Sequence, residues 1–124
     1  MMNLRKVFSV SAILCLIWVP AMANAADAFF TDLEELPIMS GLAENQAAAV
    51  TFETANGRII EVEASGAMKA SDVLAFYGET LPQLGWTRIE DGVFERDQER
   101  LALTISDTEA GRVLVAFSLS PKQP

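Results

Sequence analysis

Histidine is absent from this sequence, and its single cysteine, Cys15, lies near the amino terminus. These two absences exclude several kinds of site. A serine–histidine–acid triad or a cysteine nucleophile requires these residue types, and so do the ordinary zinc and copper sites. No glycine-rich phosphate loop follows an apolar run either. We therefore predict a protein that holds no cofactor and no metal and that is not an enzyme.

Basic side chains are also scarce. The chain has 9 lysines and arginines against 17 aspartates and glutamates, which gives a formal net charge of −8. Nucleic acid and anionic lipid both demand neutralising lysines and arginines from a protein that binds them. The charge therefore argues against a nucleic-acid partner and against binding to an anionic lipid surface.

Residues 1–25 have the three parts of a secretory signal peptide in the usual order. Arg5 and Lys6 precede an apolar run at residues 7–19 that only Ser9 and Ser11 interrupt. This run is shorter than the roughly 20 apolar residues that cross a bilayer core. The small residues at 23–25 predict cleavage before residue 26, with a cut two residues earlier as the second candidate. An uncleaved membrane anchor is the other interpretation of this segment.

Removal of the signal peptide takes away Arg5, Lys6 and the cysteine but none of the 17 acidic side chains, so the formal charge becomes −10. We expect the remaining protein to be periplasmic, with an extracellular location as the alternative, and to have no membrane span after cleavage. Without cysteine it folds on packing alone. We divide it into an extended lead segment at residues 26–47, one domain at 48–120 and a tail at 121–124. Pro37 and Gly41 argue against a long helix in the lead segment.

The first part of the domain predicts a hairpin of two half-buried strands, because apolar and polar residues alternate on both sides of Asn56-Gly57. That dipeptide favours a two-residue turn, but such a turn would place Phe52 opposite Glu61. Cross-strand partners share a face, so an apolar residue would oppose a charged one.

A three-residue loop over residues 55–57 removes this conflict. It pairs Phe52 with Ile60 and Val50 with Val62, so that both apolar rows face the core. We predict this register, with the glycine of the loop at positive φ.

A helix is predicted over residues 71–84, with Ser71 as the N-cap. Pro82 is tolerated because the residue four positions earlier is Gly78, and Gly85 ends the helix in a left-handed cap. Apolar residues at spacings of three and four predict one buried face: Val73, Phe76, Tyr77, Leu81 and Leu84.

Four strands complete the predicted domain, at residues 86–90, 93–97, 101–105 and 113–119. A two-residue turn at Asp91-Gly92 places Ile89 opposite Phe94 and Arg88 opposite Glu95. In the third hairpin, formed by the last two strands, we expect Leu103 opposite Val115. The order β-β-α-β-β-β-β implies an α+β fold, a single antiparallel sheet with one helix packed on one face.

Four residues are candidates for contact with a ligand or a partner. Tyr77 and Trp86 are aromatic residues that would stack on a ligand, or that seat the helix on the sheet as part of the core. Leu114 and Ala116 point away from the apolar row of the last strand, which suggests a surface covered by a partner or by the lead segment. We interpret the alternating carboxylates Glu61 and Glu63 as residues of a solvated sheet face.

The stretch at 73–77 with Leu81 and the Leu-Gly-Trp at 84–86 resembles a pattern in small exported bacterial proteins of unknown function. The lead-segment stretch at 36–42 is similar to theirs as well. The resemblance covers most of the chain after the signal peptide and implies a periplasmic or envelope location in a Gram-negative bacterium, but no activity. Many such proteins are lipoproteins, and this chain departs from them at Leu14-Cys15, since a lipoprotein cysteine follows a small residue.

From these exclusions we expect a non-enzymatic periplasmic protein that acts by contact with another, unknown protein, as an accessory subunit or assembly factor of an envelope complex. The alternative is a small-ligand binding module with a pocket between the helix and the lead segment. A flat apolar strip at an exposed strand edge favours the first function, and a pocket lined by Tyr77 and Trp86 favours the second.

Overall fold

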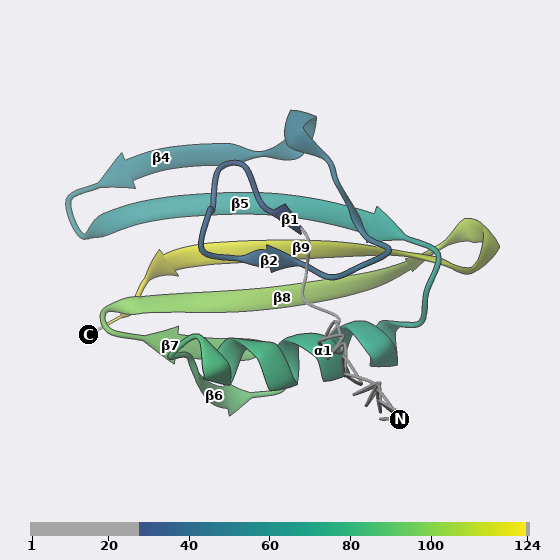
Figure 1. The fold of residues 1–124 in the computed structure, drawn as a ribbon. Coiled ribbons are helices and arrows are strands. Elements are labelled where there is room, and N and C mark those ends of the chain that lie inside the picture. The colour runs from purple at the N-terminus through teal and green to yellow at the C-terminus, as the bar shows by residue number, and fades with distance from the viewer. Residues whose placement is uncertain (1–27, 124) are drawn as a thin grey trace, which may run out of the picture.

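The computed structural model describes residues 28–123, which form nine β-strands, one α-helix and two short 3-10 helices (Figure 1). The predicted signal peptide and its cleavage site lie outside the described residues. In the lead segment, β1 (Ala28–Phe29) and β2 (Pro37–Ile38) form a two-stranded antiparallel sheet. They are followed by β3 (Ala43–Glu44), which joins the main sheet, and by the 3-10 helix η1 (Gln46–Ala48).

The main sheet is antiparallel and has one helix on one side, which confirms the predicted α+β fold. Its strand order is β3-β5-β9-β8-β7-β6, and β4 also pairs with β5. Because β9 occupies one edge of β5, the strands β3 and β4 share the other edge. The elements that follow η1 are β4 (Val50–Thr54), β5 (Gly57–Gly66), α1 (Ala70–Gln83), β6 (Thr87–Glu90), β7 (Val93–Arg96), β8 (Glu99–Thr108), η2 (Glu109–Gly111) and β9 (Arg112–Pro121).

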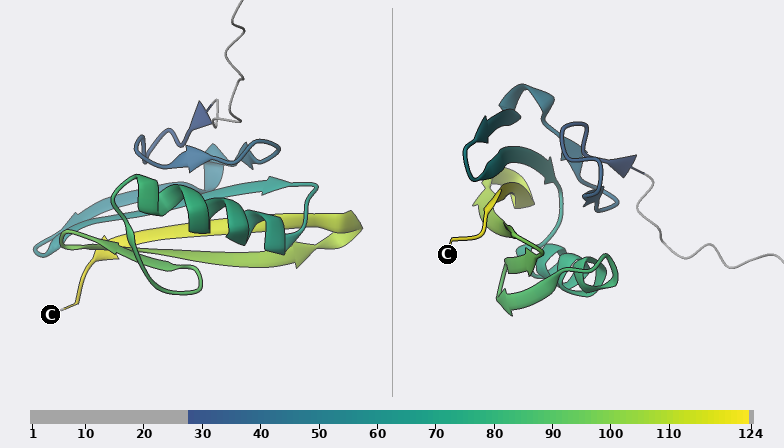
Figure 2. Two further views of the ribbon diagram at one scale, coloured as in Figure 1. Left: turned by 60° about the horizontal axis from the view of Figure 1, so that its bottom comes forward. Right: turned by 90° about the vertical axis from the view of Figure 1, so that its left-hand side faces the viewer.

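The lead segment and α1 cover the same face of the main sheet, as the two views of Figure 2 show. We call this the covered face, and the opposite side, over which no described element lies, the open face. The lead segment is tied to β9 by the rings of Phe30 and Phe117, whose centres are 5.2 Å apart. Tyr77 of α1 also packs on Phe117, with ring centres 4.9 Å apart. The core is therefore built by two covering pieces that meet over β9.

Alternation along the central strands divides their side chains between the two faces. On β5 the even-numbered residues from Ile60 to Ala64 are buried, and on β9 the odd-numbered residues from Val113 to Leu119 are buried. The polar residues between them, such as Glu61 of β5 and Ser118 of β9, lie on the open face. Within residues 28–123, no helix has both the length and the apolar character needed to cross a membrane.

Helix α1 begins and ends one residue earlier than predicted. Its N-cap is Lys69, with no side-chain cap, so the prediction of Ser71 as the N-cap is wrong. Pro82 stays inside the helix as expected, and Gly85 follows it with a φ of 92°. The chain can therefore turn at once into β6.

The buried stripe of α1 is narrower than predicted. Val73, Tyr77 and Leu81 are fully buried, whereas Phe76 is only partly buried and Leu84 is 40% exposed. Three residues spaced by four already fill the contact with the sheet. Leu84 follows the last residue of α1, at the point where the chain changes direction and Trp86 becomes buried.

The predicted register of the first hairpin is wrong, although Gly57 does have a positive φ, of 139°. Phe52 lies opposite Ile59 and Val50 opposite Glu61, so both apolar side chains of β4 point to the open face. We expected burial to decide the register. However, the covered side of β4 does not pack against the core. Thr51 and Glu53, whose side chains lie on that side, are also exposed.

The second hairpin begins with the predicted two-residue turn, which pairs Glu90 with Val93, but a bulge then shifts the register. Arg88 lies opposite Phe94, so the predicted pairs Ile89–Phe94 and Arg88–Glu95 are wrong. Trp86, just before β6, is buried, and because side chains alternate along a strand, Ile89 lies on the opposite, exposed side. Glu90 also faces outward beside Val93. Two consecutive outward residues require a bulge.

The third hairpin differs from its prediction by two residues. Leu103 lies opposite Phe117 rather than Val115, and Ile105 takes the place opposite Val115. A shift of two residues keeps every side chain on its face, so alternation alone cannot detect it. The tip conformation decides the register: Ala110 and Gly111 both have positive φ in η2.

Candidate functional site

Tyr77 and Trp86 are both core residues. Tyr77 is 0% exposed and Trp86 is 4% exposed. The Tyr77 hydroxyl donates a hydrogen bond to the Pro37 carbonyl oxygen at 2.8 Å and accepts one from the Met39 backbone N–H at 3.1 Å. This hydroxyl joins α1 to the lead segment at the place where the ligand pocket was expected.

Burial raises the pKa of Tyr77 to about 12, an effect that the hydrogen bond from the Met39 N–H partly offsets. The phenol therefore stays protonated at all physiological pH values. It therefore provides a permanent hydrogen-bonded link between α1 and the lead segment, the two pieces that cover the sheet.

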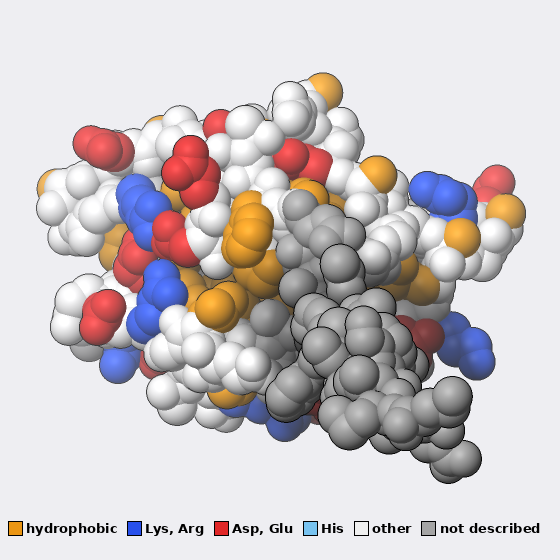
Figure 3. All heavy atoms as spheres, viewed as in Figure 1, with side chains coloured by type: hydrophobic (Ala, Val, Ile, Leu, Met, Phe, Trp, Pro, Cys, Tyr) orange, Lys and Arg blue, Asp and Glu red, His pale blue; other side chains and the backbone are white. Residues whose placement is uncertain are grey.

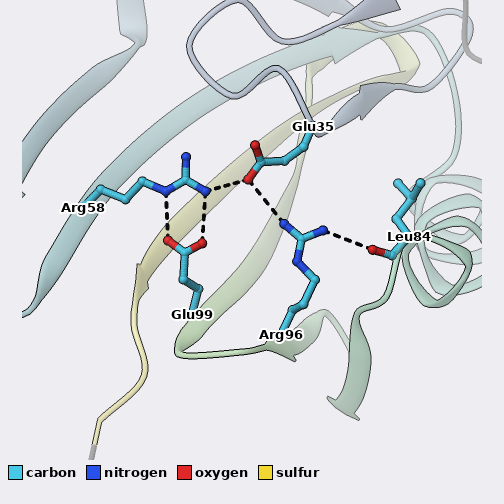
Figure 4. Close-up of polar contacts among 5 residues, drawn as sticks. All are labelled: Glu35, Arg58, Leu84, Arg96 and Glu99. Atoms are coloured by element: carbon cyan, nitrogen blue, oxygen red, sulfur yellow. Dashed lines mark hydrogen bonds and ion pairs between the residues drawn. The ribbon is translucent and has the colours of Figure 1, made fainter.

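Charged side chains gather at the end of the sheet near the β7–β8 turn, where blue and red groups alternate in Figure 3. Arg58 of β5 donates two hydrogen bonds to the Glu99 carboxylate, at 2.9 and 3.0 Å, and one to Glu35 of the lead segment at 2.6 Å (Figure 4). Arg96 also reaches Glu35, at 3.4 Å, and donates to the Leu84 carbonyl oxygen at 3.0 Å.

This network connects the lead segment, β5, the β7–β8 turn and the end of α1. The hydrogen bonds to Glu99 are the largest cause of a raised pKa at Arg58, with Glu35 adding to them and burial opposing them. The guanidinium of Arg96 also lies 4.4 Å from the centre of the Trp86 ring. Because each of these charges already has a partner, we assign the network to holding the lead segment in place.

Loss of the Arg58 side chain should weaken the fold measurably. We expect Arg58→Met to lower the free energy of unfolding by about 1 kcal/mol, because a partly exposed network is worth more than an isolated surface pair. Arg88→Met is the matched control, since its ion pair with Asp91 is exposed and separate. It should cost under about 0.5 kcal/mol. Equal effects of the two changes on urea midpoints would contradict the assigned role.

A groove with a volume of about 360 Å³ lies between α1 and the β6–β7 turn. Leu74 and Gly78 line its helix side, and Arg88 and Asp91 line its turn side. These two charged residues form an ion pair with each other. Tyr77 lines this groove, but neither Trp86 nor the lead segment does, so it is not the pocket that was expected between the helix and the lead segment.

Strand β4 has the features of a binding edge. Its only partner in the described chain is β5, and it forms the outer margin of the sheet (Figure 1). All five of its residues are exposed, including Val50 at 44% and Phe52 at 49%. Proteins usually protect such an edge with charged residues, proline or a bulge. Strand β4 has no lysine, proline or bulge, and its one charged residue is Glu53.

Leu114 and Ala116 point to the open face, as predicted from alternation, and both are partly buried. Ala116 lines a shallow hollow of about 220 Å³ on that face. The hollow exists because the neighbouring outward side chains are small, and its lining also includes Thr104, Ser118, Glu61 and Glu63. Leu114 lies further along β9, opposite Ser65.

Sequence reasoning identified Ala116 but missed Val50 and Phe52, which it assigned to the core. The sequence signal that could have found them is the short length of β4 and its single charged residue, because both features are typical of an edge strand. Comparison with protein-family models, with curated proteins and with solved structures finds no match to this chain.

Proposed function

We propose that this protein is an exported, non-enzymatic binding protein that recruits an extended segment of a partner protein to the free edge of β4. One observation carries the proposal: β4 is a five-residue edge strand, exposed along its whole length, with two large apolar side chains on one face. A role as an accessory subunit or assembly factor of an envelope complex fits such an edge.

Strand addition uses both features of β4. The backbone N–H and C=O groups on the free edge supply affinity, and alternate side chains supply specificity. Val50 and Phe52 would pack against side chains of the added strand on the open face. The partner would thus cover apolar surface that is now exposed to water.

Site-specific photo-crosslinking in cells that express the full-length gene tests this proposal. A benzophenone amino acid at position 52 should give an adduct of discrete mass. The matched control is position 89, because Ile89 is 51% exposed on the other edge strand, β6. An adduct from position 89 but none from position 52 would assign the contact to the wrong edge and refute the proposal.

A further inference from the structure

The open face beside β4 is acidic. Glu61 lies directly opposite Val50, and Glu63 follows two residues later on the same face of β5. Neither carboxylate forms a salt bridge in the described part of the chain, whereas Glu35, Asp91, Glu95 and Glu99 all do. Glu61 beside β4 and Glu63 just beyond its end are therefore available to a partner's cation.

On the side of β5 away from β4, these carboxylates border the hollow. Ala116 lies opposite Glu63, and Ser118 lies opposite Glu61. No basic residue lines the hollow. On the side towards β4, Glu61 borders the apolar side chain of Val50. The stem of a lysine or arginine can lie on Val50 with its charged group at Glu61, because such side chains are apolar along most of their length.

We propose that the segment added to β4 carries a basic side chain opposite Val50 and an apolar side chain two residues away, opposite Phe52. This inference rests on the proposed strand addition and names the chemistry of its partner. The added strand would lie roughly 10 Å from β5, two strand spacings away. A lysine or arginine covers only part of that distance, so the contact is made across Val50 by the basic side chain and the Glu61 side chain extending towards each other.

A second copy of this chain is a poor occupant of the same edge. Pairing of two β4 strands would bring Glu53 and Glu61 of one copy towards the same residues of the other. Like charges across an interface are unfavourable, and the protein has a formal net charge of −8. A basic segment is attracted by the charges that would repel a second copy.

Two blocked nonapeptides in which valine and threonine alternate from a valine at each end provide the test, one with a central lysine and the other with glutamine in its place. A valine then stands two residues from the lysine on either side. Their affinities are measured by fluorescence anisotropy for the protein expressed from its full-length gene. We expect the lysine peptide to bind about fivefold more tightly at low salt, with a smaller ratio at high salt. The ratio should fall to about one in the double variant Glu61→Gln/Glu63→Gln.

The variant Glu34→Gln/Glu109→Gln controls for net charge, because it removes two exposed carboxylates that lie away from this face. It should keep the preference for lysine. If both peptides bind native protein equally and Phe52→Lys abolishes binding, the basic preference is refuted while strand addition stands. A preference lost equally in the control variant would also refute it. Failure of both peptides to bind refutes strand addition and this inference with it.

Discussion

Phe117→Ala is expected to lower the free energy of unfolding by about 3–5 kcal/mol, the range for truncating a buried phenylalanine. Phe117 lies on β9 and is 1% exposed. Its ring contacts Phe30 of the lead segment and Tyr77 of α1, so the cavity would open where both covering pieces meet the sheet. Urea unfolding followed by tryptophan fluorescence measures the change.

The matched control for Phe117→Ala is Phe52→Ala. Phe52 is a phenylalanine in the same sheet, but it is 49% exposed on β4. Its removal should cost less than about 1 kcal/mol, the span of strand propensity at such sites. A cost at position 52 as large as that at position 117 would mean that β4 is covered in solution by the protein itself.

The same pair of phenylalanines shows what could be predicted from the sequence. Alternation identified the strand that contains each residue, and for β9 it also gave the correct face, because β9 lies in the middle of the sheet under two covers. For β4 it gave the wrong face, since the covers do not reach this edge and neither side of the strand has a core to enter. Which strand lies at an edge depends on long-range pairing, which periodicity does not record.

The candidate site was predictable only in part. The outward direction of Ala116 follows from its place between buried neighbours on β9. The juxtaposition of Ala116 with Glu63 depends on the register between β5 and β9, which are separated along the chain by α1 and three strands. The role of Tyr77 depends likewise on the lead segment, whose apolar residues show no period that would place Pro37 beside the helix.

The Tyr77 hydroxyl predicts a loss of stability at alkaline pH. Burial raises its pKa from 10.0 to about 12 in the folded protein. Below about pH 10 both the folded and the unfolded states keep the proton, so this group adds no pH dependence. Between pH 10 and 12 the unfolded state loses the proton first and is stabilised. Since one pKa unit corresponds to about 1.4 kcal/mol, the free energy of unfolding should fall by about 3 kcal/mol over this range.

Tyr77→Phe separates this effect from the titration of lysines in the same range. At about pH 9 the variant should be less stable by about 1–3 kcal/mol, because the Met39 N–H and the Pro37 carbonyl lose their buried partner. As pH rises to about 12, native protein loses the Tyr77 contribution and the variant does not, so the two stabilities should converge. Tyr77 is the only tyrosine of the chain, so tyrosinate absorbance reports its ionisation alone. A titration midpoint near 10 in folded protein, or parallel stability curves for the two proteins, would show that the hydroxyl is not buried against the lead segment.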